Sequence, residues 1–408
     1  MPATSPPRLD RGGPSHVRAA HLHGVAGLTH RTHLPLPPVL LHQASRAGPL
    51  ESLWLAAGLG ALLAASLALA VLHHRRARPA GGAGRRWAGR AGLAAWLTGL
   101  AALTSLAGLN AYVGYVPTLP ALFGQVPTLG RTGSQVVRVV IGAPALDISP
   151  QPAYVYLPPG YASPANLDRH YPVVYLLHGW PGGPLDWFRA APTQRIVDAM
   201  LADRLIQPML VVAPDDNGGW LHDSEMLNQV GGPQLETYLT RTVVGYVDAH
   251  FRTVADRAGR AIGGMSSGGY GALNLGLRHQ DVYSVILAEM PYGDPGQAAL
   301  ALLGGSRALW AANAPGHYIP TMTFSHPMAV DLLSGPHDGQ RLEARQLAGM
   351  LRDRGQPAVY TQVAGAGHTW RSAGRELPYA LAFAGQHLPG QPAGRLPPAT
   401  VHRPALRT

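Results

Sequence analysis

The feature that most restricts the fold of this chain is a run of 20 uncharged residues at 53–72, LWLAAGLGALLAASLALAVL. A helix with a rise of ~1.5 Å per residue needs about this length to cross ~30 Å of hydrocarbon. A second apolar span follows at 91–116. A pair of buried core helices would pass the same test, whereas a cleaved signal peptide has a shorter apolar region of ~7 to 15 residues. Residues 50–117 are therefore predicted to form a transmembrane anchor of two helices.

The positive charge of the chain lies around this anchor. All 32 basic residues are arginines, and the formal net charge is +10. Residues 1–130 hold 11 arginines against 2 acids (+9), and residues 131–408 hold 21 against 20 (+1). Six of the arginines crowd the stretch 75–90, so the positive-inside rule makes this loop cytoplasmic and places both flanking parts outside. A near-neutral remainder argues against nucleic-acid binding.

The two ends of the chain are expected to be disordered. Residues 1–49 are rich in Pro, His and Arg and show no helical or strand period, and residues 391–408 form a second such tail. The histidines of the first tail lack the i, i+4 spacing of a metal site, and neither a metal nor an organic cofactor is expected. The absence of cysteine excludes disulfides, zinc–thiolate sites and thiol catalysis.

Beyond a Pro/Gly-rich linker at 118–134, short apolar runs alternate with helix-like stretches. The expected strands are 136–141, 153–157, 173–177, 209–213, 260–265, 283–287, 328–333 and 358–363. The expected helices are 193–205, 234–250, 269–279, 341–355 and 376–388. This alternation predicts the α/β class, with a mostly parallel sheet covered by helices, in one domain of residues 135–390.

The first motif that indicates chemistry is Gly264-Met265-Ser266-Ser267-Gly268. It matches G-x-S-x-G, in which a tight strand-to-helix turn exposes a serine hydroxyl. In a chain with 50 glycines the pattern alone is weak, and the predicted strand before it and helix after it give it weight. Ser266 is the candidate nucleophile, because Ser267 has Met265 rather than glycine two positions before it.

The second motif, HGWPGG at 178–183, follows the predicted strand 173–177. A backbone N–H just past such a strand can join the N–H that follows the nucleophile in stabilising a tetrahedral oxyanion. The two donors would be Trp180 and Ser267. On its own, HGWPGG is more often a simple turn.

The third feature is the pair Asp338, in SGPHD, and His368, in GAGHTW, each on a loop after a predicted strand. Parallel-sheet enzymes place catalytic groups at the carboxyl ends of strands. The order Ser, Asp, His is that of the α/β-hydrolase architecture. The histidine would take the serine proton, and the carboxylate would hold its tautomer. Asp331 and Glu343, inside a predicted strand and helix, are less favoured acids.

Two further segments have open interpretations. The long insertion between Met290 and Pro327 is either an ordinary segment that packs on the domain or the lining of an acyl pocket. The pocket would be lined by Leu302, Leu303, Trp310 and Tyr318. Asp215, Asp216 and Trp220 follow another predicted strand and either contact substrate or cap a turn.

Several blocks also resemble a known family: YLLHGWPGG, PDDNGGWLHDSE, ETYLTRTVVGYVDAHFRT, GRAIGGMSSGGYGALNLGLRH, LSGPHDG and GAGHTW. Over residues 135–388 the chain resembles the esterase D and antigen 85 (mycolyltransferase-like) group of α/β-hydrolase-fold esterases. The anchor followed by NAYVGYVPTLPALFG is similar to membrane-anchored actinobacterial members. Antigen 85 itself differs, since its acid is a glutamate and its oxyanion loop is not HGW. The resemblance implies these roles: Ser266 nucleophile, Asp338 acid, His368 base, Trp180 and Ser267 oxyanion donors.

The sequence is therefore interpreted as a multi-pass plasma-membrane protein whose extracytoplasmic serine esterase domain hydrolyses acyl esters or lipid-like substrates. An acyltransferase that moves the acyl group to a sugar or lipid hydroxyl would use the same triad. A noncatalytic envelope protein that keeps the fold for binding is the alternative from another class.

Overall fold

The computed structural model describes residues 36–76, 83–125, 133–219 and 222–390. Its centre is a sheet of eight strands in the order β1-β2-β4-β3-β5-β6-β7-β8. The strands are β1 (Gln135–Ala143), β2 (Ile148–Leu157), β3 (Val173–Leu177), β4 (Leu210–Pro214), β5 (Arg260–Met265), β6 (Val285–Glu289), β7 (Ala329–Ser334) and β8 (Ala358–Gln362). Strands β3 to β8 are parallel, and β1 and β2 join one edge as antiparallel strands. The predicted mostly parallel sheet is confirmed.

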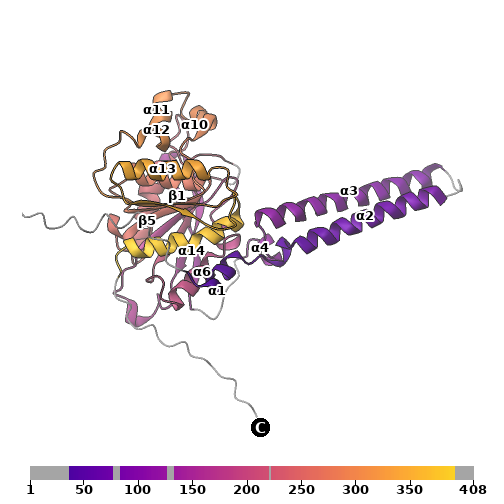
Figure 1. Ribbon diagram of the computed structural model, residues 1–408, viewed down its shortest axis with the longest axis horizontal. Helices are drawn as coiled ribbons and strands as arrows, with labels where there is room; N and C mark the ends of the chain where they lie inside the picture. The colour runs from indigo at the N-terminus through magenta and orange to yellow at the C-terminus, as the bar shows by residue number, and fades with distance from the viewer. Residues whose placement is uncertain (1–35, 77–82, 126–132, 220–221, 391–408) are drawn as a thin grey trace, which may run out of the picture. The chain divides into compact units, whose positions relative to one another are not determined.

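Helices cover both faces of the sheet, as Figure 1 shows with α13 on one side and α6 and α14 on the other. The first face carries α7 (Leu235–Thr237), the π-helix η5 (Tyr238–Val243), α8 (Val244–His250), α9 (Ser267–Arg278) and α13 (Arg341–Asp353). The second carries α1 (Pro38–Ser45), α6 (Thr193–Ala202) and α14 (Trp370–His387). The insertion before β7 forms α10 (Gly296–Leu302), α11 (Arg307–Ala312) and α12 (Pro315–Tyr318). Short elements are α5 (Asp186–Arg189), η3 (Pro144–Leu146), η4 (Pro164–Asn166) and η6 (Arg257–Gly259).

The uninterrupted apolar strands follow from this layering. In β3, Tyr175 and Leu177 pack toward α8 and α9, whereas Val174 and Leu176 pack toward α6 and α14. All five residues of β3 are buried. A strand covered on both faces needs apolar side chains at every position rather than at alternate ones.

The prediction that residues 1–49 are disordered is wrong for one part of this segment, because α1 is an ordered helix packed on α6 and α14. Leu36, Leu40 and Ala44 are buried in the same cluster as these helices. Their spacing of four residues makes one apolar stripe, which the surrounding prolines obscured in the sequence. Residues 1–35 and 391–408, the rest of the predicted tails, lie outside the described residues.

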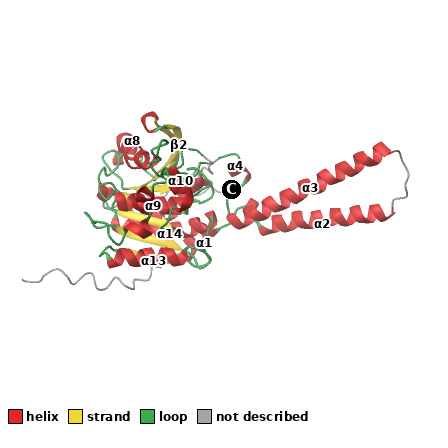
Figure 2. Cartoon of the chain, turned by 90° about the horizontal axis from the view of Figure 1, so that it is seen from above, coloured by secondary structure: helices red, strands yellow, loops and turns green. Residues whose placement is uncertain are grey.

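Two long helices, α2 (Leu53–Arg76) and α3 (Ala83–Val113), follow α1 and the short η2 (Pro49–Glu51). Both are long and apolar enough to cross a membrane by length and composition. They run together as a hairpin (Figure 2). At its base, the Asn110 side-chain amide donates to the carbonyls of Leu50 and Val116, 2.9 Å each. Gly114, with φ of 70°, ends α3 three residues before the predicted limit of 116.

The predicted linker at 118–134 is partly helical. Thr118 caps α4 (Leu119–Leu122) by accepting a hydrogen bond from the N–H of Ala121 at 3.3 Å. A threonine at this position satisfies a helix N–H that otherwise has no partner. Residues 126–132 of the linker lie outside the described residues.

Candidate active site

Ser266 occupies the sharp turn between β5 and α9, with φ of 57° and ψ of −120°. An L-residue rarely adopts such a backbone, and strain of this kind gathers at catalytic centres. The surrounding glycines allow the turn, because a Cβ on Gly264 would collide with the carbonyl of Gly268. A Cβ on Gly268 would likewise collide with the carbonyl of Leu177 in β3. The predicted strand–turn–helix context of G-x-S-x-G is therefore present.

The structure brings Ser266, Asp338 and His368 together from three loops at the carboxyl ends of β5, β7 and β8. His368 Nε2 lies 2.8 Å from Ser266 Oγ, and His368 Nδ1 lies 3.1 Å from Asp338 Oδ1. Both distances are within hydrogen-bond reach. The Asp338 side chain is fully buried, whereas that of His368 is 36% exposed. Part of the His368 side chain is thus accessible to an incoming molecule.

The backbone on both sides of His368 is fixed by the start of α14. The Gly367 N–H donates to Ser372 Oγ at 2.8 Å, and the Ser372 N–H donates to Thr369 Oγ1 at 3.2 Å. Asp338 is held in turn by the N–H of Gln340, which donates to its Oδ1 at 3.1 Å. Histidine and aspartate are therefore oriented by their own loops, independently of any ligand.

The loop that follows β3 lies directly against the serine. A Cβ added to Gly179 would be 3.4 Å from Ser266 Cβ. Trp180, the next residue, has a half-exposed side chain and a cis peptide bond to Pro181. Ser267 is the first residue of α9, where backbone N–H groups lack partners within the helix. The two predicted oxyanion donors thus belong to the two segments that flank Ser266.

A buried pair, His178 and Asp216, supports this loop, and the sequence did not predict that these two residues interact. His178 Nε2 lies 3.1 Å from Asp216 Oδ1, and the His178 N–H donates to Asp216 Oδ2 at 2.5 Å. Burial, together with the charge of Asp215, raises the pKa of Asp216, and burial lowers the pKa of His178. Asp215 caps a turn through the N–H of Gly218 at 2.6 Å. Both aspartates are engaged within the protein, and Trp220 lies outside the described residues.

The less favoured acids, Asp331 and Glu343, have other partners. The Thr361 hydroxyl donates to Asp331 Oδ1 at 2.6 Å, and the Gly293 N–H donates to Glu343 Oε1 at 2.8 Å. Only Asp338 of the three acidic candidates has a hydrogen-bond contact with His368 among those found in the described residues.

Three of the four side chains expected to line an acyl pocket pack within the protein instead. Leu303 is buried with Leu227 and Ala299, and Trp310 packs against them. Tyr318 packs on the main core, and its hydroxyl donates to Asn274 Oδ1 at 3.0 Å. The insertion therefore packs partly on the main core and partly in a small cluster that it shares with Leu227.

Three carboxyl groups are buried between β6, β7 and α14, below the triad: Glu289, Asp331 and Glu376. Burial, and then the charges of Glu376 and Asp331, raise the pKa of Glu289. Burial, and then the charges of Asp338 and Asp331, raise the pKa of Glu376. Burial also raises the pKa of Asp331 to about 7 from an ordinary value of 3.8, and the hydrogen bond from Thr361 opposes this shift. The cluster holds protons more tightly in the folded chain than in the unfolded chain.

This cluster predicts a pH-dependent loss of stability. A folded-state pKa above the unfolded value means that the stabilisation from Asp331 is complete below about pH 4 and is lost as the pH rises to about 7. Asp331→Asn removes this titration, so the stability of the variant relative to wild type should rise by roughly 2 to 4 kcal/mol over that window. Denaturant unfolding of the full chain in detergent at several pH values measures it. Parallel pH profiles for the two proteins would contradict the assignment.

Among the residues that the structure describes, no three His, Asp or Glu side chains gather in a way that could hold a metal ion. What the described site offers is a serine on a strained turn, a histidine within reach of its hydroxyl, a buried carboxylate behind the histidine, and backbone N–H groups beside it. Together with the helix-covered parallel sheet, these features are typical of the α/β-hydrolase class of enzymes.

The chain belongs to a specific family of such enzymes. The family described as "Putative esterase" matches residues 149–384, more than half of the 408-residue chain. Esterase Rv1288 of Mycobacterium tuberculosis is 34% identical over 126 residues, 31% of this chain and 25% of that protein. An endo-1,4-beta-xylanase/feruloyl esterase of Xylanibacter ruminicola is 31% identical over 136 residues, 33% of this chain and 18% of that protein. The chain thus spans a quarter or less of the length of either relative.

A solved ferulic acid esterase shares the fold, with a TM-score of 0.55 and 22% identity over 63% of this chain and 99% of the other. The chain therefore belongs to the esterase family and has the α/β-hydrolase fold.

Proposed function

We propose that the chain is a membrane-anchored, extracytoplasmic serine esterase that cleaves acyl esters through an acyl-enzyme on Ser266. The observation that carries the proposal is the continuous hydrogen-bond chain from Ser266 through His368 to Asp338. Residues 135–390 form the proposed catalytic domain, and residues 50–117 the proposed anchor.

In the proposed reaction, His368 Nε2 takes the Ser266 hydroxyl proton as the oxygen attacks the ester carbonyl carbon. The carbonyl π electrons move to oxygen, and the N–H groups of Trp180 and Ser267 stabilise the resulting oxyanion. Collapse of the tetrahedral intermediate expels the alcohol, which takes its proton from His368. Water then attacks the acyl-enzyme with His368 as base, which releases the acid and restores the serine. Asp338 stabilises the imidazolium in both halves of the cycle.

The packing of α1 supports the proposed topology. A hairpin that crosses the membrane twice leaves its two ends on the same side, and here both ends join one body. The segment before α2 packs on α6 and α14 of the hydrolase domain, while the segment after α3 leads into that domain. Since six arginines crowd 75–90, the positive-inside rule assigns the opposite side to the cytoplasm. Protease added to intact cells should degrade the domain, and full protection would reverse the orientation.

The chemistry of the acceptor separates the proposed esterase from an acyltransferase. The purified chain is incubated with a p-nitrophenyl acyl ester, with and without a disaccharide acceptor, and the products are separated chromatographically. Free acid as the only acyl product supports hydrolysis. Acylated sugar in excess of free acid would favour the transferase. The name of the xylanase/feruloyl esterase relative makes feruloyl esters the first substrate class to screen.

Failure to turn over any ester, with no covalent labelling of Ser266, would favour the third alternative, a noncatalytic envelope protein that keeps the fold for binding.

A further inference from the structure

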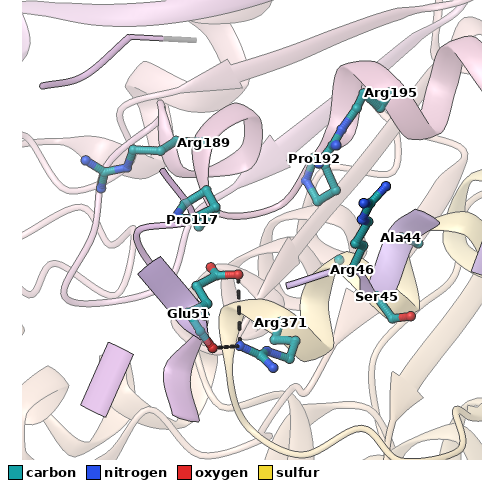
Figure 3. A pocket seen from close by; sticks show the side chains of 12 residues that line it. Ala44, Ser45, Arg46, Glu51, Pro117, Arg189, Pro192, Arg195 and Arg371 are labelled. Atoms are coloured by element: carbon teal, nitrogen blue, oxygen red, sulfur yellow. Dashed lines mark hydrogen bonds and ion pairs between the residues drawn. The ribbon is translucent and has the colours of Figure 1, made fainter. Parts of the chain in front are cut away.

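A small hollow lies where the base of the helical hairpin meets the hydrolase domain (Figure 3). Its lining comes from five places in the sequence: the end of α1, the last residue of η2, the segment that follows α3, α5 with the start of α6, and the start of α14. The charged side chains that line it are Arg46, Glu51, Arg189, Arg195 and Arg371. It is separate from the site at Ser266, none of whose proposed catalytic residues lines it.

The hollow carries an excess of positive charge. Arg371 is matched by Glu51, whose carboxylate lies 3.9 Å from its guanidinium and whose carbonyl accepts a bond from it at 3.5 Å. Arg189 is matched by Asp186 at 2.5 Å. Within the described part of the chain, neither Arg46 nor Arg195 forms an ion pair or a hydrogen bond through its side chain, and both are exposed. The guanidinium groups of Arg46 and Arg195 therefore have no partner among the described residues.

The charges of Arg46 and Arg195 act on one another. Partial burial and then the charge of Arg46 lower the pKa of Arg195, and Glu51 only partly offsets them. Figure 3 shows Arg46 and Arg195 extending toward the same side of the hollow. Two adjacent cations repel each other, and this repulsion raises the free energy of the unliganded protein. An anion bound between them would remove the repulsion.

The hollow also lies at a defined depth relative to the proposed anchor. Glu51 precedes the first residue of α2 by two positions, and Gly114 follows the last residue of α3 by one. Helices of hydrocarbon-spanning length end where the lipid headgroups begin. With the hairpin in a membrane, the four arginines stand in the headgroup layer of one leaflet.

We propose that this hollow binds the phosphate group of an anionic phospholipid from the leaflet next to the catalytic domain. The inference relies on the membrane anchoring proposed above, but not on the catalytic triad. Arginine suits a phosphate because its planar guanidinium donates two parallel N–H bonds to two phosphate oxygens. Arg46 and Arg195 supply the free donors, while Arg371, held by Glu51, and Arg189, held by Asp186, shape the walls. A bound lipid would tie α1, α6 and α14 to the hairpin.

The test uses the full chain in a nonionic detergent with three probes. Dioctanoyl phosphatidylglycerol is the anionic lipid, dioctanoyl phosphatidylcholine is a zwitterionic lipid with the same phosphodiester, and inorganic phosphate is the lipid-free anion. We expect phosphatidylglycerol to bind saturably and to raise the melting temperature. Arg46→Gln/Arg195→Gln should weaken that affinity about tenfold or more, because each charge-assisted bond contributes on this scale.

The matched control is Arg307→Gln/Arg345→Gln, which removes two exposed arginines from α11 and α13. It should bind phosphatidylglycerol as wild type does. Without lipid, Arg46→Gln/Arg195→Gln should melt at or above the wild-type temperature, since it relieves repulsion between cations. A lower melting temperature without lipid would assign the two arginines a structural role and overturn the proposal.

Three other results would also overturn it. Equal weakening by both double variants would indicate general attraction of a cationic protein to an anionic micelle. Equal affinity for phosphatidylcholine and phosphatidylglycerol would remove the requirement for net negative charge. Inorganic phosphate binding as tightly as phosphatidylglycerol would make this a site for free phosphate. Because all readouts are binding and melting, a failure here is distinguishable from loss of ester hydrolysis.

Discussion

Ser266→Ala should lower kcat/KM for a p-nitrophenyl acyl ester by roughly 10⁴- to 10⁶-fold, because the oxygen that forms the acyl-enzyme is absent. The residual rate would come from the oxyanion donors and from substrate binding, which the substitution leaves in place. A spectrophotometric assay of p-nitrophenol release on purified protein in detergent measures the effect.

The control for this variant is Ser284→Ala, which removes a hydroxyl just before β6, at the amino end of the sheet and away from the site. It should retain activity within a few-fold of wild type. Hydrolysis by Ser266→Ala at the wild-type rate would show that the reaction takes place elsewhere in the chain.

Asp338→Asn is the second variant with a large expected effect, a loss of about 10³- to 10⁴-fold in kcat. An amide at this position no longer stabilises the imidazolium and favours the wrong tautomer of His368, although it fills the same space. Because substrate binding does not depend on this carboxylate, KM should change much less than kcat.

Asp331→Asn is the matched comparison, because Asp331 is also a buried aspartate of the β7 region but bonds to Thr361 instead of His368. It should keep kcat within a few-fold of wild type while changing the pH dependence of unfolding as described above. Equal loss of kcat in both variants would mean that removal of any buried carboxylate disrupts the site, and would defeat the specific role of Asp338.

The sheet was predictable because each of its strands is short, apolar and bounded by turn residues. Six of them alternate along the chain with helical stretches, whose apolar residues recur with a period of 3.6. All eight expected strands are present, with ends shifted by a few residues, as in β2, which begins at Ile148 rather than at 153. The serine, aspartate and histidine could be singled out because each follows such a strand, and parallel strands bring their carboxyl ends to one edge.

Features made by side chains from distant segments could not be predicted in the same way. The stripe of Leu36, Leu40 and Ala44 has a helical period, but only its packing on α6 and α14 shows why it is ordered. The pair of His178 and Asp216 joins two loops 38 residues apart in the chain. Neither residue has a pattern around it that indicates a partner.

The hollow lined by arginines at the base of the hairpin is also a feature that the sequence could not predict. Arg46 and Arg371 are separated by most of the chain, and positions 189 and 195 belong to a third segment. From the sequence, Arg46 counts only as one more charge in a basic N-terminal region. Its relation to Arg195 depends on the order of helices on one face of the sheet, which strand periodicity does not determine.

The most direct test of the central claim is covalent labelling with a fluorophosphonate, followed by mass spectrometry of the digested protein. Such a probe reacts with a serine that a neighbouring base activates and forms a stable phosphonyl adduct on its oxygen. The account predicts one adduct, on the peptide that contains Ser266, absent in Ser266→Ala and strongly slowed in His368→Ala. An adduct that persists in Ser266→Ala, or a native protein that shows none, would contradict the assignment of Ser266 as the nucleophile.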